Sequence, residues 1–479
     1  MIPLSLAEIA AITGGRVVDD PAVTVTGDVE YDSRKIGPGG LFVAFEGEKV
    51  DGHDFAGVAA AAGAAAVLGS RETGVPGIVV DDPLAALAAL ARAVVSRLDG
   101  LTVVGLTGSS GKTTTKDYIG QLLSRLGPTV ALPGSLNNEL GFPYTVLRAS
   151  GQTRFLVLEM GARGIGHIRY LTGIARPSIG VVLNIGTAHI GEFGSKEGTA
   201  LAKGELVEAL PSSGVAVLNA DDPLVAAMAS RTSASVVLVG STGSLTASDV
   251  TLDAAGRASY ILSDGSRTGA VQLAVAGEHQ VANTLAAGAV ALAAGMTFDD
   301  LVVALGEVGI ASERRMDVFA RPDGVTVIDD SYNANPSSTS AALRALAAMS
   351  GGRRTTAVLG FMAELGEHEV SGHAEVGRLA AELGVDRLIA VTGDAGPILD
   401  GAAGVAGWQG TGLLAVDQAA AIEILRHDLR ADDVVLVKGS RYRTWDVADW
   451  LRPVARSERS EPRSHGEAGS VPLEEVQPT

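Results

Sequence analysis

Apolar residues gather along the chain in short runs, which are separated by turns and by longer stretches with helical spacing. Runs of about four to eight apolar residues are typical of buried strands, and their alternation with helical patterns predicts mostly parallel sheets covered by helices. The alternation restarts twice, which predicts an α/β fold with three domains at residues 1–98, 99–312 and 313–452. Residues 453–479 are polar and have no apolar face, so we expect a disordered tail there.

The first domain shows the shortest strand patterns. Its alanine-rich run at residues 55–68 predicts a helix. Asp82 stands just before Pro83, and this pair predicts the start of another helix, because Asp caps helix N-termini and proline fits the first turn.

The second and third domains carry stronger strand patterns, which predict doubly wound, mostly parallel sheets. In the second domain the apolar runs lie at residues 102–108, 155–162, 179–186, 214–221 and 235–241, and residues 272–295 close the domain with a predicted strand and helix. In the third domain they lie at residues 324–332, 355–366, 387–393 and 433–440.

The composition excludes several classes of function. The net charge of −18 argues against a nucleic-acid partner, because binding to phosphate backbones requires Lys and Arg. The chain has no cysteine, which excludes disulfides, thiolate metal sites and a thiol nucleophile. The N-terminal residues lack the pattern of a secretory signal, and no apolar run reaches the ~20 residues of a membrane span. We therefore expect a cytoplasmic protein without membrane insertion.

A glycine-rich loop, TGSSGKTT at Thr107–Thr114, follows the first strand of the second domain and precedes a helix. Glycines let the loop curl so that its N–H groups face a phosphate, and the helix N-terminus adds positive potential. Lys112 then reaches the terminal phosphates, and the Thr113 hydroxyl is placed to ligate Mg²⁺. The predicted nucleotide-binding residues of this loop are Gly108, Ser109, Ser110, Gly111, Lys112, Thr113 and Thr114.

The loop alone leaves the type of nucleotide chemistry open. Leu106 stands five residues before Gly111, where the usual motif has glycine, so the loop is a shortened variant. An ordinary Gly/Ser turn is the structural alternative, but it does not explain a lysine directly after the glycine. A GTPase would carry N-K-x-D, whereas residues 219–222 read N-A-D-D. A small-molecule kinase remains compatible with this loop.

Further motifs decide between these alternatives. The chain contains GSLNNELGFPYTVLR, LEMGARGIGHI, NIGTAHIGEFGS, ALAKGEL, GEHQVANTLAA, ERRMDVF, DDSYNANPSS, MAELGEH and LVKGSR, in this order. From about Ser33 to Trp450 it resembles the Mur ligases, bacterial enzymes that build the peptide of the cell-wall precursor. The resemblance implies a small N-terminal uridine-nucleotide-binding domain, a central P-loop domain and a C-terminal Rossmann-like domain.

The resemblance also implies a reaction. ATP phosphorylates a carboxylate to an acyl phosphate, and an amine then displaces phosphate to form an amide. DDSYNANP and the early DSRK…GGLFVAFEGEKVDGHDF resemble the family member that joins D-alanyl-D-alanine to UDP-N-acetylmuramoyl-tripeptide. We therefore expect these two molecules as substrates of a monomeric enzyme.

Three residues are candidates for the metal site. Glu159 ends a buried strand, where a carboxylate is costly unless it is paired or bound to metal. The resemblance implies that Glu159 and His189 ligate two Mg²⁺ ions, and that Lys203 is carbamylated by CO₂ and joins them. A carbamate forms only from a neutral amine, so the site must lower the usual lysine pKa. The alternatives are a capping or salt-bridging Glu159, a structural His189, and a surface Lys203 paired with an acid on its own helix.

The resemblance assigns the other residues by ligand. On the nucleotide side it implies Asn138 with its neighbour Asn137, Asn283, Arg315 and Asp330. Arg314 and Asp329 are alternatives shifted by one position. For the incoming dipeptide or phosphate it implies Tyr332, Asn333, Lys438, Ser440 and Arg441, although polar turns and basic strand ends look similar. For the uridine group it implies Ser33, Arg34, Phe45, Gly47 and His53.

Several alternatives and one departure accompany these assignments. The family often has Gly-Asp-Met where this chain has Phe361 in the middle, so we assign no role there. The competing functions are the diaminopimelate- or lysine-adding Mur ligase, a folylpolyglutamate synthase-like enzyme, and an inactive nucleotide-binding scaffold. The D-N-P-R signature of diaminopimelate-adding members is missing. Sharing one reaction among three domains predicts hinge closure near residues 311–315.

Overall fold

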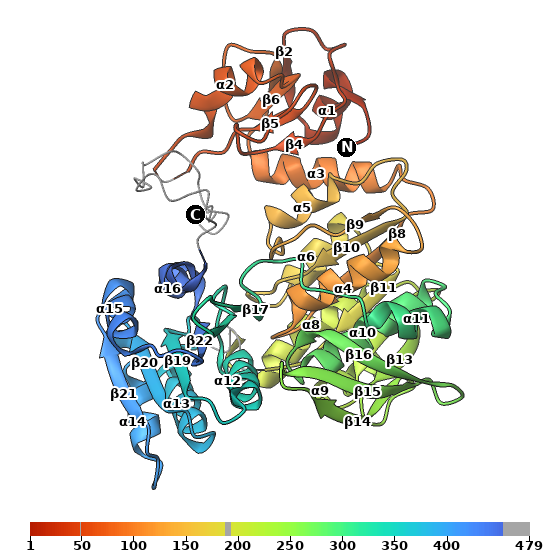
Figure 1. Cartoon of the computed structure of the whole chain (residues 1–479). Coiled ribbons are helices and arrows are strands. Elements are labelled where there is room, and N and C mark those ends of the chain that lie inside the picture. Colours follow the sequence, from red (N-terminus) through yellow and green to blue (C-terminus); the bar gives the residue numbers. More distant parts are fainter. Residues whose placement is uncertain (48, 187–192, 454–479) are drawn as a thin grey trace.

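A computed structural model describes residues 1–47, 49–186 and 193–453 (Figure 1). Three α/β units follow one another along the chain, and mostly parallel sheets form their centres. This arrangement confirms the predicted fold class. The predicted residue boundaries between the domains stay a prediction. Among the helices that the structure describes, none combines the length and apolar character needed to cross a membrane.

The first unit has a five-stranded sheet in the order β2-β7-β6-β5-β4, with only β2 antiparallel to its neighbour. A two-stranded pair, β1 and β3, lies beside it. Its elements are β1 Leu4–Ser5, α1 Leu6–Thr13, β2 Arg16–Val18, β3 Thr24–Val25, β4 Val29–Glu30, β5 Leu41–Val43, η1 Gly52–Phe55, α2 Ala56–Ala61, β6 Ala66–Gly69, β7 Gly77–Val79 and α3 Pro83–Val95.

Two local predictions in this unit have different outcomes. The predicted helix over residues 55–68 is wrong in its second half, because α2 ends at Ala61 and β6 begins at Ala66. Gly63 has φ +104, a left-handed conformation that ends the helix and lets the chain return as a strand. The predicted helix start is confirmed, since the Asp82 side chain accepts N–H bonds from residues 84 and 85 and Pro83 begins α3.

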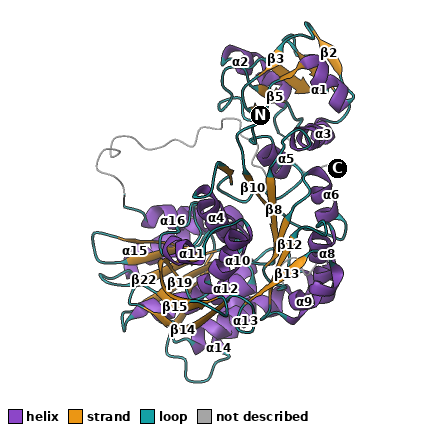
Figure 2. Ribbon diagram, turned by 90° about the vertical axis from the view of Figure 1, so that its right-hand side faces the viewer, coloured by secondary structure: helices purple, strands orange, loops and turns teal. Residues whose placement is uncertain are grey.

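The central unit has six parallel strands in the order β13-β12-β11-β8-β10-β9. Figure 2 shows α6 and α8 on one side of these strands, and α4 and α10 on the other. The elements are β8 Thr102–Thr107, α4 Lys112–Ser124, β9 Thr129–Val130, α5 Gly141–Val146, β10 Phe155–Glu159, α6 His167–Ile174, β11 Ile179–Val182, α8 Lys196–Glu208, β12 Val215–Asn219, α9 Pro223–Ala226, η2 Ala227–Arg231 and β13 Ser235–Val239.

A three-stranded antiparallel sheet follows the parallel sheet of this unit. The sequence patterns predict its last strand and the helix after it, but not its first two strands. Its buried and exposed positions alternate in β15, which is the pattern of a sheet with one face covered. The covered face packs into the same core as α4 and α10. These elements are β14 Thr246–Leu252, β15 Arg257–Ser263, β16 Thr268–Ala276, α10 Gln280–Ala293 and α11 Phe298–Leu305.

The third unit has a six-stranded sheet in the order β17-β18-β22-β19-β20-β21, parallel except for β17. The four predicted strands are present, and the outer strands β17 and β21 were not predicted. The elements are β17 Asp317–Ala320, β18 Thr326–Asp329, α12 Pro336–Ser350, β19 Thr355–Gly360, η3 Gly366–His368, α13 Glu369–Glu382, β20 Arg387–Val391, η4 Gly393–Ala395, α14 Pro397–Ala403, β21 Thr411–Ala415, α15 Gln418–Asp428, β22 Val434–Lys438, η5 Arg441–Thr444 and α16 Trp445–Leu451.

The linker between the central and third units is bonded to the helix that follows the glycine loop. The Asp117 carboxylate of α4 accepts the N–H groups of Ala311 and Ser312 at 3.1 and 2.8 Å. One turn further along α4, Gln121 exchanges two hydrogen bonds with the backbone of Gly309. The linker is therefore anchored at the point where the third unit begins. The predicted hinge closure stays a prediction.

Candidate active site

The glycine loop joins β8 to α4, as its pattern predicts. Gly111 is the residue just before α4 and has φ +79, a conformation that side chains rarely adopt. A Cβ atom at Gly111 would lie 2.6 Å from Oδ1 of Asn283, so glycine also allows α10 to approach the loop. The sequence thus folds locally into a tight turn whose helix N-terminus faces outward toward a cavity.

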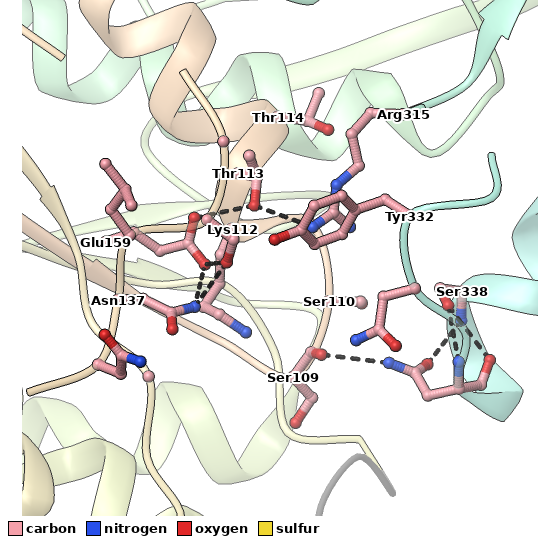
Figure 3. A pocket seen from close by; sticks show the side chains of 18 of the residues that line it. Ser109, Ser110, Lys112, Thr113, Thr114, Asn137, Glu159, Arg315, Tyr332 and Ser338 are labelled. Carbon is pink, nitrogen blue, oxygen red and sulfur yellow. Dashed lines mark hydrogen bonds between the residues drawn. The ribbon is translucent and has the colours of Figure 1, made fainter. Parts of the chain in front are cut away.

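A cavity of about 840 Å³ lies in front of this turn. All three units line it, with Tyr31 and Lys35 from the first unit and α12 residues from the third. The figure of this cavity shows the loop, Glu159 and Arg315 directed toward one another (Figure 3). The predicted site residues that line it are Ser109, Ser110, Gly111, Lys112, Thr113, Thr114, Asn138, Glu159, Asn283, Arg315, Asp330, Tyr332, Asn333 and Lys438.

Glu159 is the buried carboxylate of this cavity. Its Oε2 accepts the Thr113 hydroxyl at 2.8 Å, and its Oε1 accepts the Asn137 amide at 2.6 Å and the Ser135 hydroxyl at 3.0 Å. Burial alone would raise the pKa of Glu159, but Lys112, Lys116 and Arg315 together hold that pKa below its usual value. The residue is therefore an anion at neutral pH, placed beside the loop threonine.

Two lysines meet behind the loop. Nζ of Lys112 donates to the Gly108 carbonyl at 3.0 Å, and Nζ of Lys203, from α8, donates to the same carbonyl at 3.2 Å. Lys203 is 2% exposed and forms no ion pair with any residue that the structure describes. Burial, and then the positive charge of Lys112, lower the pKa of Lys203 well below its usual value. Lys203 is thus a buried amine with a strong tendency to be neutral.

Arg315 crosses from the third unit to the loop. Its Nη2 donates to Oγ1 of Thr113 at 3.3 Å, and its guanidinium lies 4.2 Å from the ring centroid of Tyr332. Its Nε is buried and has no hydrogen-bond partner among the described residues. A cation with an unpartnered donor, directed at the loop, is suited to receive an anionic group.

The neighbouring Arg314 and Asp329 lie elsewhere. Arg314 pairs with Asp449 at 2.8 Å, and Asp329 accepts a hydrogen bond from Arg452 at 2.7 Å. Neither residue lines the cavity, whereas Arg315 and Asp330 do. The geometry therefore favours the assignment of Arg315 and Asp330 over the shifted pair.

Asn184 is a residue of this site for which the sequence patterns predicted no role. Its Oδ1 accepts the N–H groups of Ser109 and Ser110 at 3.0 and 2.9 Å, and its amide donates to the Ser110 carbonyl at 3.2 Å. From the third unit, the Asn335 amide reaches the Ser109 carbonyl at 3.4 Å. The loop is thus held from two sides. The sequence signal that could have identified Asn184 was its position just after the buried strand β11.

Two predicted site residues, Asn138 and Ser440, form hydrogen bonds with neighbouring backbone groups. Oδ1 of Asn138 caps α5 by accepting the Gly141 N–H at 2.7 Å. The Ser440 hydroxyl donates to the Ala334 carbonyl at 3.0 Å and accepts the Ala363 N–H at 3.1 Å, and Ser440 does not line the cavity. Arg441 begins η5, but its side chain, like all of His189, lies outside the described residues.

The five predicted uridine contacts lie outside the cavity. Arg34 is exposed and pairs with Asp32 at 2.8 Å. His53 is buried, with Nδ1 2.6 Å from Asp51 and Nε2 accepting the Ser70 N–H at 2.9 Å. Ser33, Phe45 and Gly47 are partly buried loop residues of the same unit. These five residues stay a prediction.

The donors of the site suit a nucleotide with Mg²⁺. Thr113 and Glu159 offer hydroxyl and carboxylate oxygens, the ligand type that Mg²⁺ prefers, and they lie 2.8 Å apart. Three or more His, Asp or Glu side chains do not cluster anywhere in the described part of the chain, so protein carboxylates alone do not form a cage. Mg²⁺ usually keeps waters and phosphate oxygens as its other ligands, which agrees with this sparse set.

The glycine loop, the buried Glu159 and the cations around it define an enzyme that binds ATP. Family models match the chain as Mur ligase family, catalytic domain, at residues 27–95, as Mur ligase middle domain at 106–291, and as Mur ligase, glutamate ligase domain, at 314–441. The chain belongs to the Mur ligase family, whose members are ATP-dependent ligases that form peptide bonds.

Individual relatives agree with this assignment. UDP-N-acetylmuramoyl-tripeptide--D-alanyl-D-alanine ligase of Mycobacterium tuberculosis strain H37Rv is 50% identical, over 92% of this chain and 96% of the relative. The enzyme of that name from Escherichia coli K12 is 35% identical with the same coverage. MurF of Acinetobacter baumannii superposes with a TM-score of 0.82 at 33% identity, covering 93% of this chain and 98% of that one.

A further solved structure bears on nucleotide binding. The MurF ligase of Thermotoga maritima, in complex with ADP, matches with a TM-score of 0.75 at 30% identity and covers 88% of this chain and 97% of that one.

Proposed function

We propose that this chain joins D-alanyl-D-alanine to UDP-N-acetylmuramoyl-tripeptide, with ATP, and releases the pentapeptide, ADP and phosphate in peptidoglycan precursor synthesis. The observation that carries the proposal is the 50% identity to enzymes named for this reaction, over 96% of their length. We also infer a cytoplasmic monomer, because ATP and nucleotide-linked precursors are cytoplasmic and because all three units of this chain contribute residues to the cavity.

The nucleotide would be held at the glycine loop. Lys112 and the N–H groups at the start of α4 would face its phosphates, Arg315 would reach the same position from the third unit, and Asn283 and Asp330 would lie on the nucleoside side. Thr113 and Glu159 would hold Mg²⁺, together with His189 and a carbamylated Lys203 for a second ion. Bound Mg²⁺ would neutralise the charge that develops on the transferred phosphoryl group.

The state of Lys203 follows from its surroundings. A protonated Lys203 would be a buried cation beside a second cation, Lys112, without a carboxylate partner among the described residues. Carbamylation replaces this cation by an anion, which Lys112 and bound metal would stabilise. Burial favours the neutral amine that reacts with CO₂, and this supports the proposed modification of Lys203.

The reaction would then take place in two steps, phosphoryl transfer and amide formation. The tripeptide carboxylate attacks the terminal phosphorus of ATP, the bond from this phosphorus to the ADP oxygen breaks, and ADP leaves. Lys112 and Arg315 stabilise the negative charge on the phosphoryl oxygens during this transfer. The amine of the dipeptide attacks the acyl carbon, the bond from that carbon to the phosphate oxygen breaks, and phosphate leaves. Enclosure by three units keeps water from the acyl phosphate during the interval.

The test is phosphate release from ATP with defined substrate pairs. We expect release only when UDP-N-acetylmuramoyl-tripeptide and D-alanyl-D-alanine are both present. Release with diaminopimelate or lysine and the dipeptide-level precursor, but not with D-alanyl-D-alanine, would identify a different member of the family. Release with a folate and glutamate would identify the more distant ligase. ATP binding without release in any pair would identify a scaffold.

A further inference from the structure

Residues 311–316 lead from the central unit into the third unit, and their backbone is unusual on both sides of Arg315. Arg314 has φ +57 and Met316 has φ +49, so the arginine stands between two side-chain-bearing residues in left-handed conformations. Such conformations cost energy and persist only where contacts hold them, mainly at functional positions. On the C-terminal side the contact is the Met316 N–H, which donates to Oδ1 of Asp330 at 3.1 Å.

On the N-terminal side, an aspartate of α4 holds the segment. Oδ2 of Asp117 accepts the N–H groups of Ala311 and Ser312, and its Oδ1 accepts the Ser312 hydroxyl at 3.1 Å. Asp117 and Ser312 are both buried, so water does not compete for these bonds. A carboxylate of the central unit is therefore bonded to the chain three residues before Arg315.

The position of Asp117 on α4 relates these bonds to the glycine loop. Asp117 lies one turn after Thr113, and residues four apart in a helix share a face. The linker contacts this face twice, first through its backbone at Asp117 and then through Nη2 of Arg315, which donates to Oγ1 of Thr113 at 3.3 Å (Figure 3). The bonds to Asp117 therefore set the register in which Arg315 meets the loop threonine.

A second loop, around Gly134, is bonded to the same residues. The Gly134 N–H donates to the Ser312 hydroxyl at 2.8 Å. Nζ of Lys116, which pairs with Asp117 at 3.1 Å, donates to the Gly134 carbonyl at 2.8 Å. The residues just after Gly134 provide two of the hydrogen bonds to the Glu159 carboxylate. One buried network thus connects the linker with the loop that binds Glu159.

We propose that Asp117 is a positioning residue for phosphoryl transfer, which holds Arg315 against the glycine loop through the backbone of residues 311 and 312. This inference rests on the proposed function, in which Arg315 stabilises the transferred phosphoryl group. Asp117 does not line the cavity, so it acts on the reaction through Arg315 and not by contact with a substrate. A displacement of about 1 Å at a reacting centre costs up to about 100-fold in rate, which gives such a residue a measurable effect.

The experiment measures phosphate release by the full-length enzyme with ATP, UDP-N-acetylmuramoyl-tripeptide and D-alanyl-D-alanine. We expect a kcat about 100-fold lower for Arg315→Ala and about tenfold lower for Asp117→Asn. The double variant should match Arg315→Ala within about twofold, because a positioning residue has no effect without the group that it positions. The KM for UDP-N-acetylmuramoyl-tripeptide should stay within about twofold of wild type in Asp117→Asn, since a positioning defect at Arg315 changes kcat.

Ser312→Ala is the milder variant, because it keeps the ion pair between Asp117 and Lys116. It provides the same test if Asp117→Asn does not fold. Ser312→Ala should lower kcat about threefold, the effect of a lost hydrogen bond, and should leave the residual rate of Arg315→Ala unchanged. Ser124→Ala is the matched control, since Ser124 is an exposed serine of α4 whose hydroxyl bonds only within the helix. It should behave as wild type.

Three outcomes separate the inference from the proposed function. Unchanged kcat in Ser312→Ala and in folded Asp117→Asn would overturn the inference. Losses that multiply when either change is combined with Arg315→Ala would also overturn it, because the network would then only stabilise the fold. If wild type releases no phosphate with both substrates present, the proposed function itself is wrong.

Discussion

The central and third units each contain a fully buried lysine near the active site, and the two lysines differ in their surroundings. Lys203 in the central unit and Lys438 in the third unit are both 2% exposed, and burial lowers the pKa of both. Lys438 is ion-paired with Asp330 and donates to the Asn333 carbonyl at 2.9 Å. Lys203 has only the Gly108 carbonyl, at 3.2 Å, among the described residues.

From this difference we infer a structural role for the ion-paired Lys438 and a reactive role for Lys203. Around Lys438 the polar groups satisfy one another, because Asp330 and the Asn333 carbonyl both pair with the amine. Around Lys203 no carboxylate of the described residues balances a charge on the amine. A buried cation without a partner is costly, and such cost is typical of functional positions rather than of stabilising ones.

The largest effect is expected from replacing each lysine by methionine and measuring unfolding in urea. Lys438→Met leaves the Asp330 carboxylate buried without its partner, which should cost about 3–5 kcal/mol. Lys203→Met removes a buried amine that has no ion-pair partner among the described residues, and should leave the free energy of unfolding unchanged or higher. The double variant Lys438→Met, Asp330→Asn should recover part of the loss. Equal destabilisation by both single variants would contradict the comparison.

For the ligation rate, in contrast to the free energy of unfolding, a large effect is expected from replacing Lys203. Lys203→Ala should lower the ligation rate by about 10²–10³-fold, the size found when one charge-stabilising group is removed from an active site. Added acetate or formate should restore part of the rate by replacing the carbamate oxygens. Lys196→Ala, an exposed lysine at the start of the same helix, is the control and should behave as wild type. Undiminished ligation by Lys203→Ala would exclude the carbamate.

A smaller effect is expected from replacing Tyr332, which lies beside Arg315. The Tyr332 ring lies under the Arg315 guanidinium, a contact that contributes about 1 kcal/mol when partly buried. Tyr332→Leu should therefore raise the KM for ATP roughly fivefold, with a smaller change in kcat, in steady-state assays. Tyr332→Phe keeps the ring and should resemble wild type. If both variants weaken ATP equally, the hydroxyl rather than the ring is important.

The smallest effect concerns the pH dependence of stability at His373, which is bonded to the loop after β19. Burial lowers the pKa of His373, which accepts the Met362 N–H as a neutral ring. Below a pH of ~6.5 the unfolded chain binds a proton at this residue before the folded chain does, so stability should fall as pH decreases in that range. Thermal unfolding of wild type and His373→Gln at pH 7.5 and 5.5 measures this. The advantage of wild type should shrink at the lower pH, and an unchanged difference would contradict the prediction.

The sequence by itself determined the fold class and the positions of the polar strand ends. Strands such as β10, β11 and β22 are mostly apolar runs buried on both faces, so they are visible without tertiary information. The glycine loop was equally visible, because a lysine after glycine at a strand–helix junction has few structural explanations. The antiparallel strands β14 and β15 were missed, since many of their positions face solvent and resemble loops.

Only the tertiary structure decided how these residues act on one another. Lys203 lies 95 positions from Gly108 in the chain, and its burial beside Lys112 is what lowers its pKa. The choice of Arg315 over Arg314 and the hold of Asn184 on the loop depend equally on contacts between distant segments. Local patterns specify where a polar residue occurs, but its charge state depends on neighbours that only the folded chain brings together.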